Sequence, residues 1–395
     1  MRNRVQAYAW GSHTALATLR GETAPTADPE AELWMGAHPI APSRLATESG
    51  ERSLVELVAD HPRELLGTPV STEFGGLPFL MKLLAARQPL SLQAHPSAEQ
   101  AKAGFAREEA TGLSLSAPTR SYKDPHHKPE LIAALTPFSA LVGFRSTRDT
   151  ARLFAALGAA RLAPLARALS EASPSEALRL LFDTVTQSAP TAREDLASET
   201  LAACRAAAGK PFDFTREVAW GVRIGDLYPG DPGIVLALAL NLVVLEPGQA
   251  LYLPAGNLHA YLEGTGVEIM ASSDNVLRGG LTPKHVDARE LSRVLDFEAG
   301  PPALVPTDLR GFERHYRTPA REFALSRFEL SGTTATVGPV HGPEIVVVTS
   351  GSLEIRRQDE SVRLPPGASV FVAAEGGAYT LSGAGTAFRA RVNDG

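Results

Sequence analysis

The sequence lacks the features that would place the protein outside a reducing compartment or in a membrane. Among 395 residues there is one cysteine, Cys204, so no intrachain disulfide can form, which best suits a reducing compartment. The most apolar run, GIVLALALNLVVL (233–245), is interrupted by Asn241 and falls short of the about 20 residues that span a bilayer. The opening residues, MRNRVQAYAWGSHTAL, lack the apolar core of a signal peptide. These absences predict a cytoplasmic, soluble protein.

An excess of basic residues is also absent. The net charge is −6, from 38 Lys and Arg against 44 Asp and Glu, which argues against nucleic acid or an anionic membrane as the partner. A hydrophobic content of 44% and a charged content of 21% are typical of a globular protein. The length suffices for two or three domains. No pattern reports an oligomeric state, and a monomer is the expectation.

The composition and the hydrophobic spacing change along the chain. Residues 146–209 are rich in Ala, Leu and Arg with helical spacing, and they predict several helices without obvious chemistry. From about 212 to the end, short apolar runs separated by Gly and Pro predict strands and turns. Such spacing is typical of a β-sandwich or jelly roll.

Two segments in the second half resemble each other. EPGQALYLPAGNLHAYLEG (246–264) and PPGASVFVAAEGGAYTLSG (365–383) each run from Pro-Gly through an apolar strand and a turn to Ala-Tyr and a further strand. We interpret them as two copies of one β unit. Aligned on the Pro-Gly pairs, His259 corresponds to Ala378. Only the first copy can therefore carry a metal ligand at this position.

The first copy contains the pattern G-x5-P-x-G-x2-H (248–259), which resembles the second motif of the cupin superfamily. In cupins the Pro and Gly turn one strand into the next and the His points into the barrel as a metal ligand. We therefore predict a mainly β protein with inserted helices. Its expected parts are a cupin (jelly-roll) β-barrel catalytic domain (1–145 plus 210–300), a helical insert domain (146–209) and a metal-free cupin-like β domain (301–395).

Four side chains have the chemistry of one metal site: Gln93, His95, Glu130 and His259. Residues i and i+2 of a strand share a face, so Gln93 and His95 point to one place. Imidazole nitrogens and carboxylate oxygens suit Zn²⁺, and an amide oxygen is an unusual but allowed donor. Without cysteine ligands, such a site would be catalytic rather than structural. The plain alternatives are core side chains bonded to backbone, a solvated Glu130 and a His259 that closes a turn.

Seven stretches, in order and on both sides of the helical segment, give the chain a resemblance over nearly its full length to the type I mannose-6-phosphate isomerases. They are YAWG, ELWMGAHP, LPFLMKLLAARQPLSLQAHP, YKDPHHKPE, YPGDPG, LYLPAGNLHAYLEG and VEIMASSDNVLRGGLTPKHVD. The resemblance implies zinc-dependent, reversible interconversion of mannose 6-phosphate and fructose 6-phosphate. It also implies one zinc ion per chain on Gln93, His95, Glu130 and His259.

The resemblance further implies which side chains surround the substrate. Arg278 matches the arginine that the family regards as catalytic. Other matches line the same pocket: Lys82, Lys128, Tyr261, Glu268 and Lys284. The chain departs from the family at His126, where Asn is usual, and at Ser97, where an acidic residue is usual. Neither departure removes an expected metal ligand, so they concern the surroundings of the site.

The reaction explains why such residues are needed. Moving a carbonyl from C1 to C2 of a sugar requires a base for the proton and stabilisation of the enediolate oxygens. A phosphate dianion requires local positive charge in an acidic chain, and we assign this to Arg278 and Lys284 with help from Ser91. Lys128 and Glu268 are the leading candidates for the base. Lys82 and His127 remain open, the latter for ring opening.

Two functions of other classes remain as alternatives. A cupin could bind a sugar phosphate without turnover, although degenerate binders usually lose a ligand or the arginine. A metal-dependent cupin oxygenase would favour two or three His with one carboxylate on Fe(II), which Gln93 fits poorly.

Overall fold

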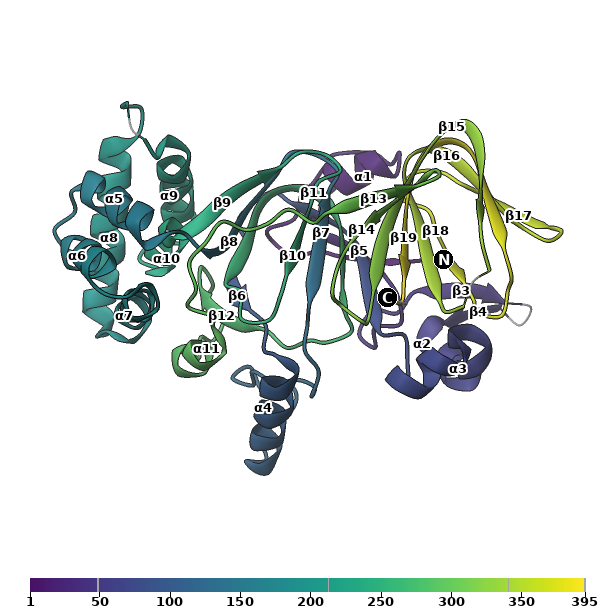
Figure 1. The fold of residues 1–395 in the computed structure, drawn as a ribbon, viewed down its shortest axis with the longest axis horizontal. Helices are drawn as coiled ribbons and strands as arrows, with labels where there is room; N and C mark the ends of the chain where they lie inside the picture. Colours follow the sequence, from purple (N-terminus) through teal and green to yellow (C-terminus); the bar gives the residue numbers. More distant parts are fainter. Residues whose placement is uncertain (48–49, 212, 340, 394–395) are drawn as a thin grey trace.

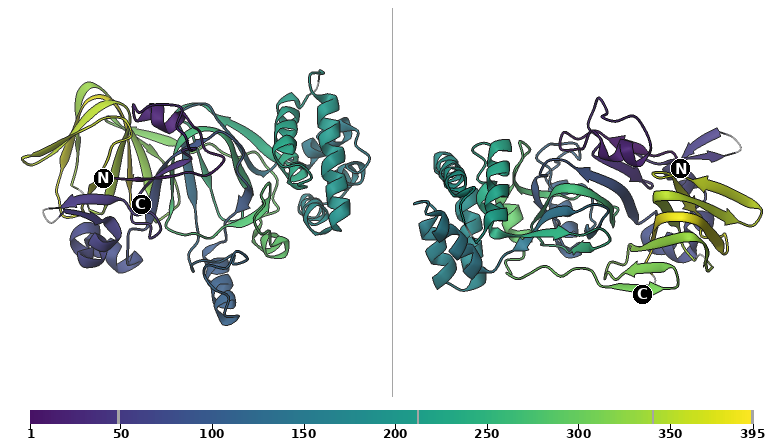
Figure 2. Two further views of the ribbon diagram at one scale, coloured as in Figure 1. Left: turned by 180° about the vertical axis from the view of Figure 1, so that it is seen from behind. Right: turned by 90° about the horizontal axis from the view of Figure 1, so that it is seen from above.

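The chain forms three regions that lie in a row along the longest axis (Figure 1). The computed structural model describes residues 1–47, 50–211, 213–339 and 341–393. Helices occupy one end, a strand-rich region carrying most of the first 145 residues lies in the middle, and the C-terminal strands form the other end. The view from above shows the same order (Figure 2). The fold is mainly β with inserted helices, as the sequence predicts.

The central region contains ten strands in two connected sheets. Their bounds are β1 Arg4–Gln6, β2 Glu32–Met35, β5 Phe79–Ala86, β6 Leu92–Ala94, β7 Glu130–Ala134, β8 Phe138–Phe144, β9 Leu240–Leu245, β10 Ala250–Leu253, β11 His259–Ala271 and β12 Leu277–Gly280. In the part of the chain that the structure describes, no pairing joins β1 to β12. The jelly-roll strands therefore form two curved, connected sheets rather than a closed barrel.

The long strand β11 joins the two sheets. Its first half, from His259 to Glu263, pairs with β8, and His259 also pairs with Gln93 of β6. Its second half, from Gly264 to Ala271, pairs with β5 and β7. Gly264, with φ of +136°, stands where the strand passes from one sheet to the other, and a Cβ there would lie 2.7 Å from the Phe138 ring. One strand thus carries residues into both walls of the central region.

The helical region is longer than the sequence suggests. Its helices are α5 Thr147–Leu157, α6 Ala163–Glu171, α7 Pro174–Gln187, α8 Pro190–Ala207, α9 Thr215–Leu227 and α10 Gly233–Ala239. The expectation of strands from about 212 is wrong for α9 and α10, which pack against α8. Residues 233–240 are buried all round. Because a fully buried run shows no periodicity, its sequence does not distinguish helix from strand. The division of the chain into three domains stays a prediction.

The C-terminal region forms a seven-stranded antiparallel sheet. Its strands are β13 Thr307–Arg310, β14 Glu313–Tyr316, β15 Ala324–Val337, β16 Glu344–Arg357, β17 Glu360–Leu364, β18 Ser369–Val372 and β19 Tyr379–Arg391. One apolar core runs from this sheet into the central region, and it includes Met81 of β5 and Phe388 of β19. The N-terminal amine donates to Ser369 O at 2.8 Å, which ties the first residues to this end.

The remaining elements cover edges of these regions. They are α1 Ala15–Leu19, the hairpin of β3 Arg44–Thr47 and β4 Gly50–Ser53, α2 Leu54–Asp60, α3 Pro62–Phe74, α4 Ala98–Ala110 and α11 Ala288–Val294. The helices α2 and α3 lie beside the C-terminal strands, whereas α4 projects from the central region (Figure 1). In the described residues, no helix is both long and apolar enough to cross a bilayer.

Candidate metal and substrate site

Strand register brings four predicted ligands to one point. Gln93 of β6 pairs with His259, the first residue of β11. Glu130, the first residue of β7, pairs with Met270 near the end of the same strand. His95 directly follows β6, two residues beyond Gln93 and therefore on its side of the strand. The four side chains thus come from three separate parts of the sequence and meet inside the central region.

Three of these side chains face one another at short distances. His95 Nε2 lies 3.2 Å from Glu130 Oε1, and His259 Nε2 lies 3.4 Å from Glu130 Oε2. The amide nitrogen of Gln93 lies 3.4 Å from His259 Nε2. A half-turn of this amide exchanges nitrogen for oxygen, the atom that can coordinate a metal. Donor atoms of His95, Glu130 and His259 all lie within 4.8 Å of one another, a grouping that could hold a metal ion.

Backbone carbonyls orient both imidazoles. His95 Nδ1 donates to Asn275 O at 2.7 Å, and His259 Nδ1 donates to Asn257 O at 3.0 Å. Each Nε2 is therefore the nitrogen with a free lone pair, directed at Glu130. Burial lowers the pKa of His95, which favours the neutral form that binds metals. Both imidazoles are thus oriented as ligands.

Two buried atoms of this group lack a hydrogen-bond partner among the described residues, His95 Nε2 and Glu130 Oε2. An unpaired buried polar atom costs about 1–3 kcal/mol, so such atoms call for an explanation. Burial alone would raise the pKa of Glu130, but nearby positive charge, including the Lys128 side chain 3.1 Å away, holds it well below its usual range. A carboxylate anion with two directed imidazole lone pairs fits a divalent cation.

A cavity of about 670 Å³ opens beside this group. Most of the predicted substrate residues line it, namely Lys82, Ser91, Lys128, Tyr261, Glu268, Arg278 and Lys284, and so do the metal candidates Gln93 and Glu130. His95 and His259 lie beneath the wall, 0% and 1% exposed. The structure therefore brings the metal candidates and the substrate candidates into one site.

A buried charged network occupies one wall of the cavity. In β5 every residue is buried, yet the strand carries Lys82. The ammonium of Lys82 lies 2.9 Å from Glu268 Oε2 and 3.3 Å from Glu32 Oε1, while Trp34 Nε1 donates to Glu32 at 2.7 Å. Burial raises the pKa of Glu268, although Lys82 opposes this shift. The network supplies a carboxylate, that of Glu268, to the cavity lining, with the Lys82 cation beside it.

Tyr261 and Lys128 line the same cavity as this network. Burial and the nearby Glu268 raise the pKa of Tyr261 well above its usual range, so its hydroxyl stays protonated. Tyr261 packs edge-on against Phe138, with ring centroids 5.3 Å apart. Lys128 Nζ lies 3.1 Å from Glu130 Oε1. Both side chains place proton donors on the cavity surface.

Positive charge also gathers in the part of the cavity lining formed by β12 and the loop that follows it, at Arg278 and Lys284. Within the described ranges, neither the Arg278 guanidinium nor the Lys284 ammonium has an acidic partner. Burial lowers the pKa of Arg278, and burial together with Arg278 lowers the pKa of Lys284. Lys123 also lies close enough to feel the Arg278 charge. Neighbouring cations without counter-charges are suited to binding an anion.

His127 lies apart from the site. Its Nε2 is 2.6 Å from Glu322 Oε1, and the ring lines a different hollow together with His126. The predicted catalytic role of His127 therefore has no support from its position. His126, the departure from the family pattern, has an exposed side chain, and its backbone carbonyl accepts from Asn275 Nδ2 at 2.8 Å. Ser97, the other departure, caps α4 by accepting the N–H of Gln100.

Sequence reasoning missed several supporting residues. Asn275 is fully buried, orients His95 through its carbonyl, and accepts the backbone N–H of Lys123 at 2.7 Å through its side chain. Glu32 and Trp34 complete the Lys82 network. Asn275 lies in VEIMASSDNVLRGG and the other two in ELWMGAHP, stretches that carry the family resemblance. An asparagine, a glutamate and a tryptophan at these positions do not by themselves indicate a metal or substrate site.

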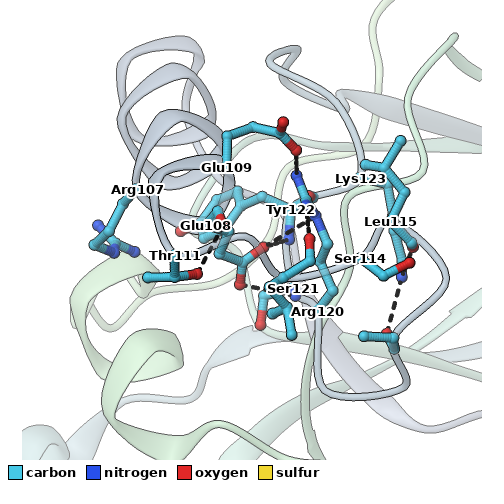
Figure 3. Close-up of polar contacts among 12 residues, drawn as sticks. Arg107, Glu108, Glu109, Thr111, Ser114, Leu115, Arg120, Ser121, Tyr122 and Lys123 are labelled. Carbon is cyan, nitrogen blue, oxygen red and sulfur yellow. Dashed lines mark hydrogen bonds and ion pairs between the residues drawn. The ribbon is translucent and has the colours of Figure 1, made fainter.

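A hydrogen-bonded frame fixes the segment that leads to Glu130 (Figure 3). Glu108 of α4 accepts the N–H groups of Ser121 and Tyr122 at 3.1 and 2.9 Å. The buried Arg120 guanidinium donates to Tyr122 O at 2.7 Å and binds Glu109. The Tyr122 ring packs on Gly104, where a Cβ would lie 2.3 Å from the ring. The frame therefore fixes the residues directly before Lys123.

Two strand-rich regions, one with a His/Glu/His group inside its jelly-roll strands, define a metal-binding protein of the cupin class. Residues 1–147 match the family "Phosphomannose isomerase type I, catalytic domain", and residues 313–392 match "Mannose-6-phosphate isomerase, cupin domain". The mannose-6-phosphate isomerase of Salmonella typhimurium is 39% identical, over 97% of this chain and 96% of its own. That of Emericella nidulans is 33% identical, over 94% and 89%.

A solved structure agrees with these relatives. A mannose 6-phosphate isomerase crystallised with zinc bound superimposes with a TM-score of 0.91 and 38% identity, covering 99% of this chain and 98% of that one. The chain therefore belongs to the type I phosphomannose isomerase family.

Proposed function

We propose that the protein is a zinc-dependent isomerase that interconverts mannose 6-phosphate and fructose 6-phosphate. The observation that carries this proposal is the His95–Glu130–His259 group beside a cavity that is also lined by Arg278 and Lys284. Family membership supports the same activity. Gln93, His95, Glu130 and His259 would hold one zinc ion, which as a Lewis acid stabilises negative charge that develops on the sugar oxygens.

Proton transfer between C1 and C2, through a cis-enediol(ate), requires a base at the cavity surface. We assign this role to Glu268, because its carboxylate lies in the cavity and the Lys82 ammonium at 2.9 Å favours its ionised form. Lys128 already contacts Glu130, with Nζ 3.1 Å from Oε1, and it lines the cavity, where it can donate a hydrogen bond to a sugar oxygen. Tyr261 also lines the cavity, and its protonated hydroxyl can donate a hydrogen bond to the substrate.

The phosphate end of the substrate binds at the cationic wall. Arg278 can fork onto two phosphate oxygens, Lys284 adds a second charge, and Ser91 adds a hydroxyl. Binding energy from this remote group orients C1 and C2 at the reacting end. Replacement of Arg278 by Ala is therefore expected to lower affinity and turnover for the phosphorylated sugar together.

One assay tests the reaction and its metal requirement. Formation of fructose 6-phosphate from mannose 6-phosphate is measured with a coupled enzyme, before and after chelation and again after zinc is restored. The proposal predicts turnover that falls on chelation and returns with zinc, under air and under nitrogen alike. Tight sugar-phosphate binding without turnover would instead favour a non-catalytic binder, and product formation only with oxygen would favour an oxygenase.

The base assignment has its own test. In heavy water, the enzyme exchanges the C2 hydrogen of mannose 6-phosphate as the proton leaves and returns. The Glu268→Gln variant should lose this exchange while it retains zinc and substrate. Loss of exchange in Lys128→Met, with exchange intact in Glu268→Gln, would transfer the role to Lys128.

We further infer a monomer that acts in the cytoplasm. Cys204, the one thiol in the sequence, is fully buried, and burial raises its pKa to about 11, so it is unreactive and forms no bridge. The zinc-loaded chain is expected to elute in size-exclusion chromatography at the volume of a 41.8 kDa protein.

A further inference from the structure

A carboxylate from outside the cavity holds the loop that follows β12. Asp231 lies in the turn that leads into α10 and does not line the cavity. Its Oδ2 accepts the backbone N–H of Thr282 at 3.2 Å, and its Oδ1 accepts that of Gly233 at 2.8 Å. One side chain therefore joins the start of α10 to the loop that bears Lys284.

The loop adopts a rare backbone conformation where Asp231 binds it. Leu281, 1% exposed, has φ of +55°, in the left-handed region that residues other than glycine seldom adopt. Gly280 has φ of +136°, and a Cβ there would lie 3.0 Å from Gly233 Cα, so the two segments touch backbone to backbone. Such a conformation persists only where the surroundings fix it. The Asp231 carboxylate is one of the groups that do so.

A second hydrogen bond extends this restraint to Lys284. Thr282 Oγ1 accepts the backbone N–H of Lys284 at 3.1 Å. Thr282 and Lys284 line the cavity together with Arg278. Two like charges are thereby kept close on one wall, although their repulsion would separate them if the loop were free.

We propose that Asp231 is a positioning residue for phosphate recognition, which fixes Lys284 beside Arg278 by holding the backbone of Leu281 and Thr282. The inference rests on the proposed function, in which Arg278 and Lys284 bind the substrate phosphate. Asp231 itself touches neither the substrate cavity nor the metal candidates.

The test compares Asp231→Asn with the wild type, both as zinc-loaded full chains. Asparagine keeps one oxygen but turns an N–H₂ toward a backbone N–H, so one of the two bonds is lost. We expect KM for mannose 6-phosphate and the inhibition constant of inorganic phosphate to rise together by about tenfold, with kcat within about twofold, as for a lost hydrogen bond to a charged group. Zinc content should not change.

Two further variants separate positioning from general stability. Asp287→Asn is the matched control, because Asp287 also accepts a backbone N–H, that of Glu290 at 2.9 Å, but caps α11 away from the cavity. Its KM should equal that of the wild type. Thr282→Val removes the second bond, and should weaken phosphate inhibition by about threefold, in line with a neutral hydrogen bond. A lower melting temperature in Asp231→Asn with unchanged KM and phosphate inhibition would overturn the proposal.

Variants of Arg278 and Lys284 distinguish a failure of this inference from a failure of the proposed phosphate site. If neither Arg278→Ala nor Lys284→Ala weakens phosphate inhibition, the phosphate site itself is wrong, and Asp231 has nothing to position. If Lys284→Ala weakens it but Asp231→Asn and Thr282→Val do not, only the role of Asp231 is overturned. The double variant Asp231→Asn/Lys284→Ala should bind phosphate no more weakly than Lys284→Ala alone, since both act through one group.

Discussion

The central and C-terminal strand regions share a strand register but differ in what fills them. In the central region, Glu130 of β7 pairs with Leu253 of β10, and in the C-terminal region Glu344 of β16 pairs with Val372 of β18. When the two sequence copies are aligned on their Pro-Gly turns, Leu253 corresponds to Val372. The two glutamates therefore occupy the same position in the two regions.

The correspondence extends to the neighbouring strands, but the buried cation lies on a different strand in each region. Two residues further along β7 and β16, the partner strand carries Glu268 in the first region and Arg389 in the second. On its other side, Lys82 lies opposite Glu268, whereas Ser326 lies opposite Arg389. Each region thus buries charges of both signs, but the cation comes from β5 in one and from β19 in the other.

The two glutamates differ in their neighbours, and these neighbours determine whether each can bind a metal ion. Glu344 accepts from Tyr379 Oη at 2.8 Å and from Arg389 at 3.1 Å, so its oxygens are occupied by donors. Glu130 instead faces the Nε2 lone pairs of His95 and His259, and Lys128 supplies one donor, 3.1 Å from its Oε1. A carboxylate surrounded by donors belongs to a structural ion-pair network, whereas one that shares a space with lone pairs needs a cation. The same position therefore serves stability in one region and metal binding in the other.

Replacing each of the two glutamates by glutamine should give the largest difference between the regions, in both zinc content and activity. Glu130→Gln removes the anionic ligand, and we expect kcat/KM to fall by about a thousandfold or more, about 4 kcal/mol of transition-state stabilisation, along with the zinc content. Glu344→Gln, measured in parallel, should retain zinc and activity per folded chain. Equal activity losses in the two variants would contradict the different roles of Glu130 and Glu344.

Arg389→Met should be the most destabilising change in the C-terminal region. It leaves Glu313 and Glu344 without the buried cation that lies 2.6 and 3.1 Å from them, and breaking such a network costs about 3–5 kcal/mol. Urea denaturation gives the free energy of unfolding. Arg356→Met is the control, since that arginine forms an exposed pair with Glu354 worth about 1 kcal/mol or less. Similar losses in both variants would contradict the structural role of the network.

Lys82→Met should shift the pH dependence of catalysis. The Lys82 charge opposes the rise in the pKa of Glu268 that burial causes, so without it this pKa rises further. Since the base is active when ionised, the acidic limb of the kcat/KM profile should move to higher pH, with activity at neutral pH about 10- to 100-fold lower. An acidic limb at unchanged pH would remove Glu268 from the role of base.

The smallest effect is expected from restoring a histidine to the second copy. Ala378, which aligns with His259, is exposed, and Glu344, which occupies the position of Glu130, is already bonded to donors. Ala378→His should therefore leave zinc at one ion per chain, measured by atomic absorption after dialysis. A second bound zinc ion would show that one missing ligand was the whole difference between the regions.

The sequence predicted those parts of the site whose placement depends on residues close together in the chain. Gln93 and His95 had to share a side of their strand, and the cupin-like turn placed His259 at the start of the next one. Spacing did not reveal that Asn275 orients His95, because this contact joins residues 180 positions apart. Nor did adjacency to Lys128 bring His127 into the cavity, since neighbouring side chains in an extended segment point to opposite sides.

An anomalous-difference map of a zinc-soaked crystal, collected at the zinc absorption edge, tests the metal site most directly. We predict one peak per chain, enclosed by His95 Nε2, His259 Nε2 and the Glu130 carboxylate, and its loss in Glu130→Gln. A peak elsewhere, or no ordered zinc in a crystal of active enzyme, would contradict the account.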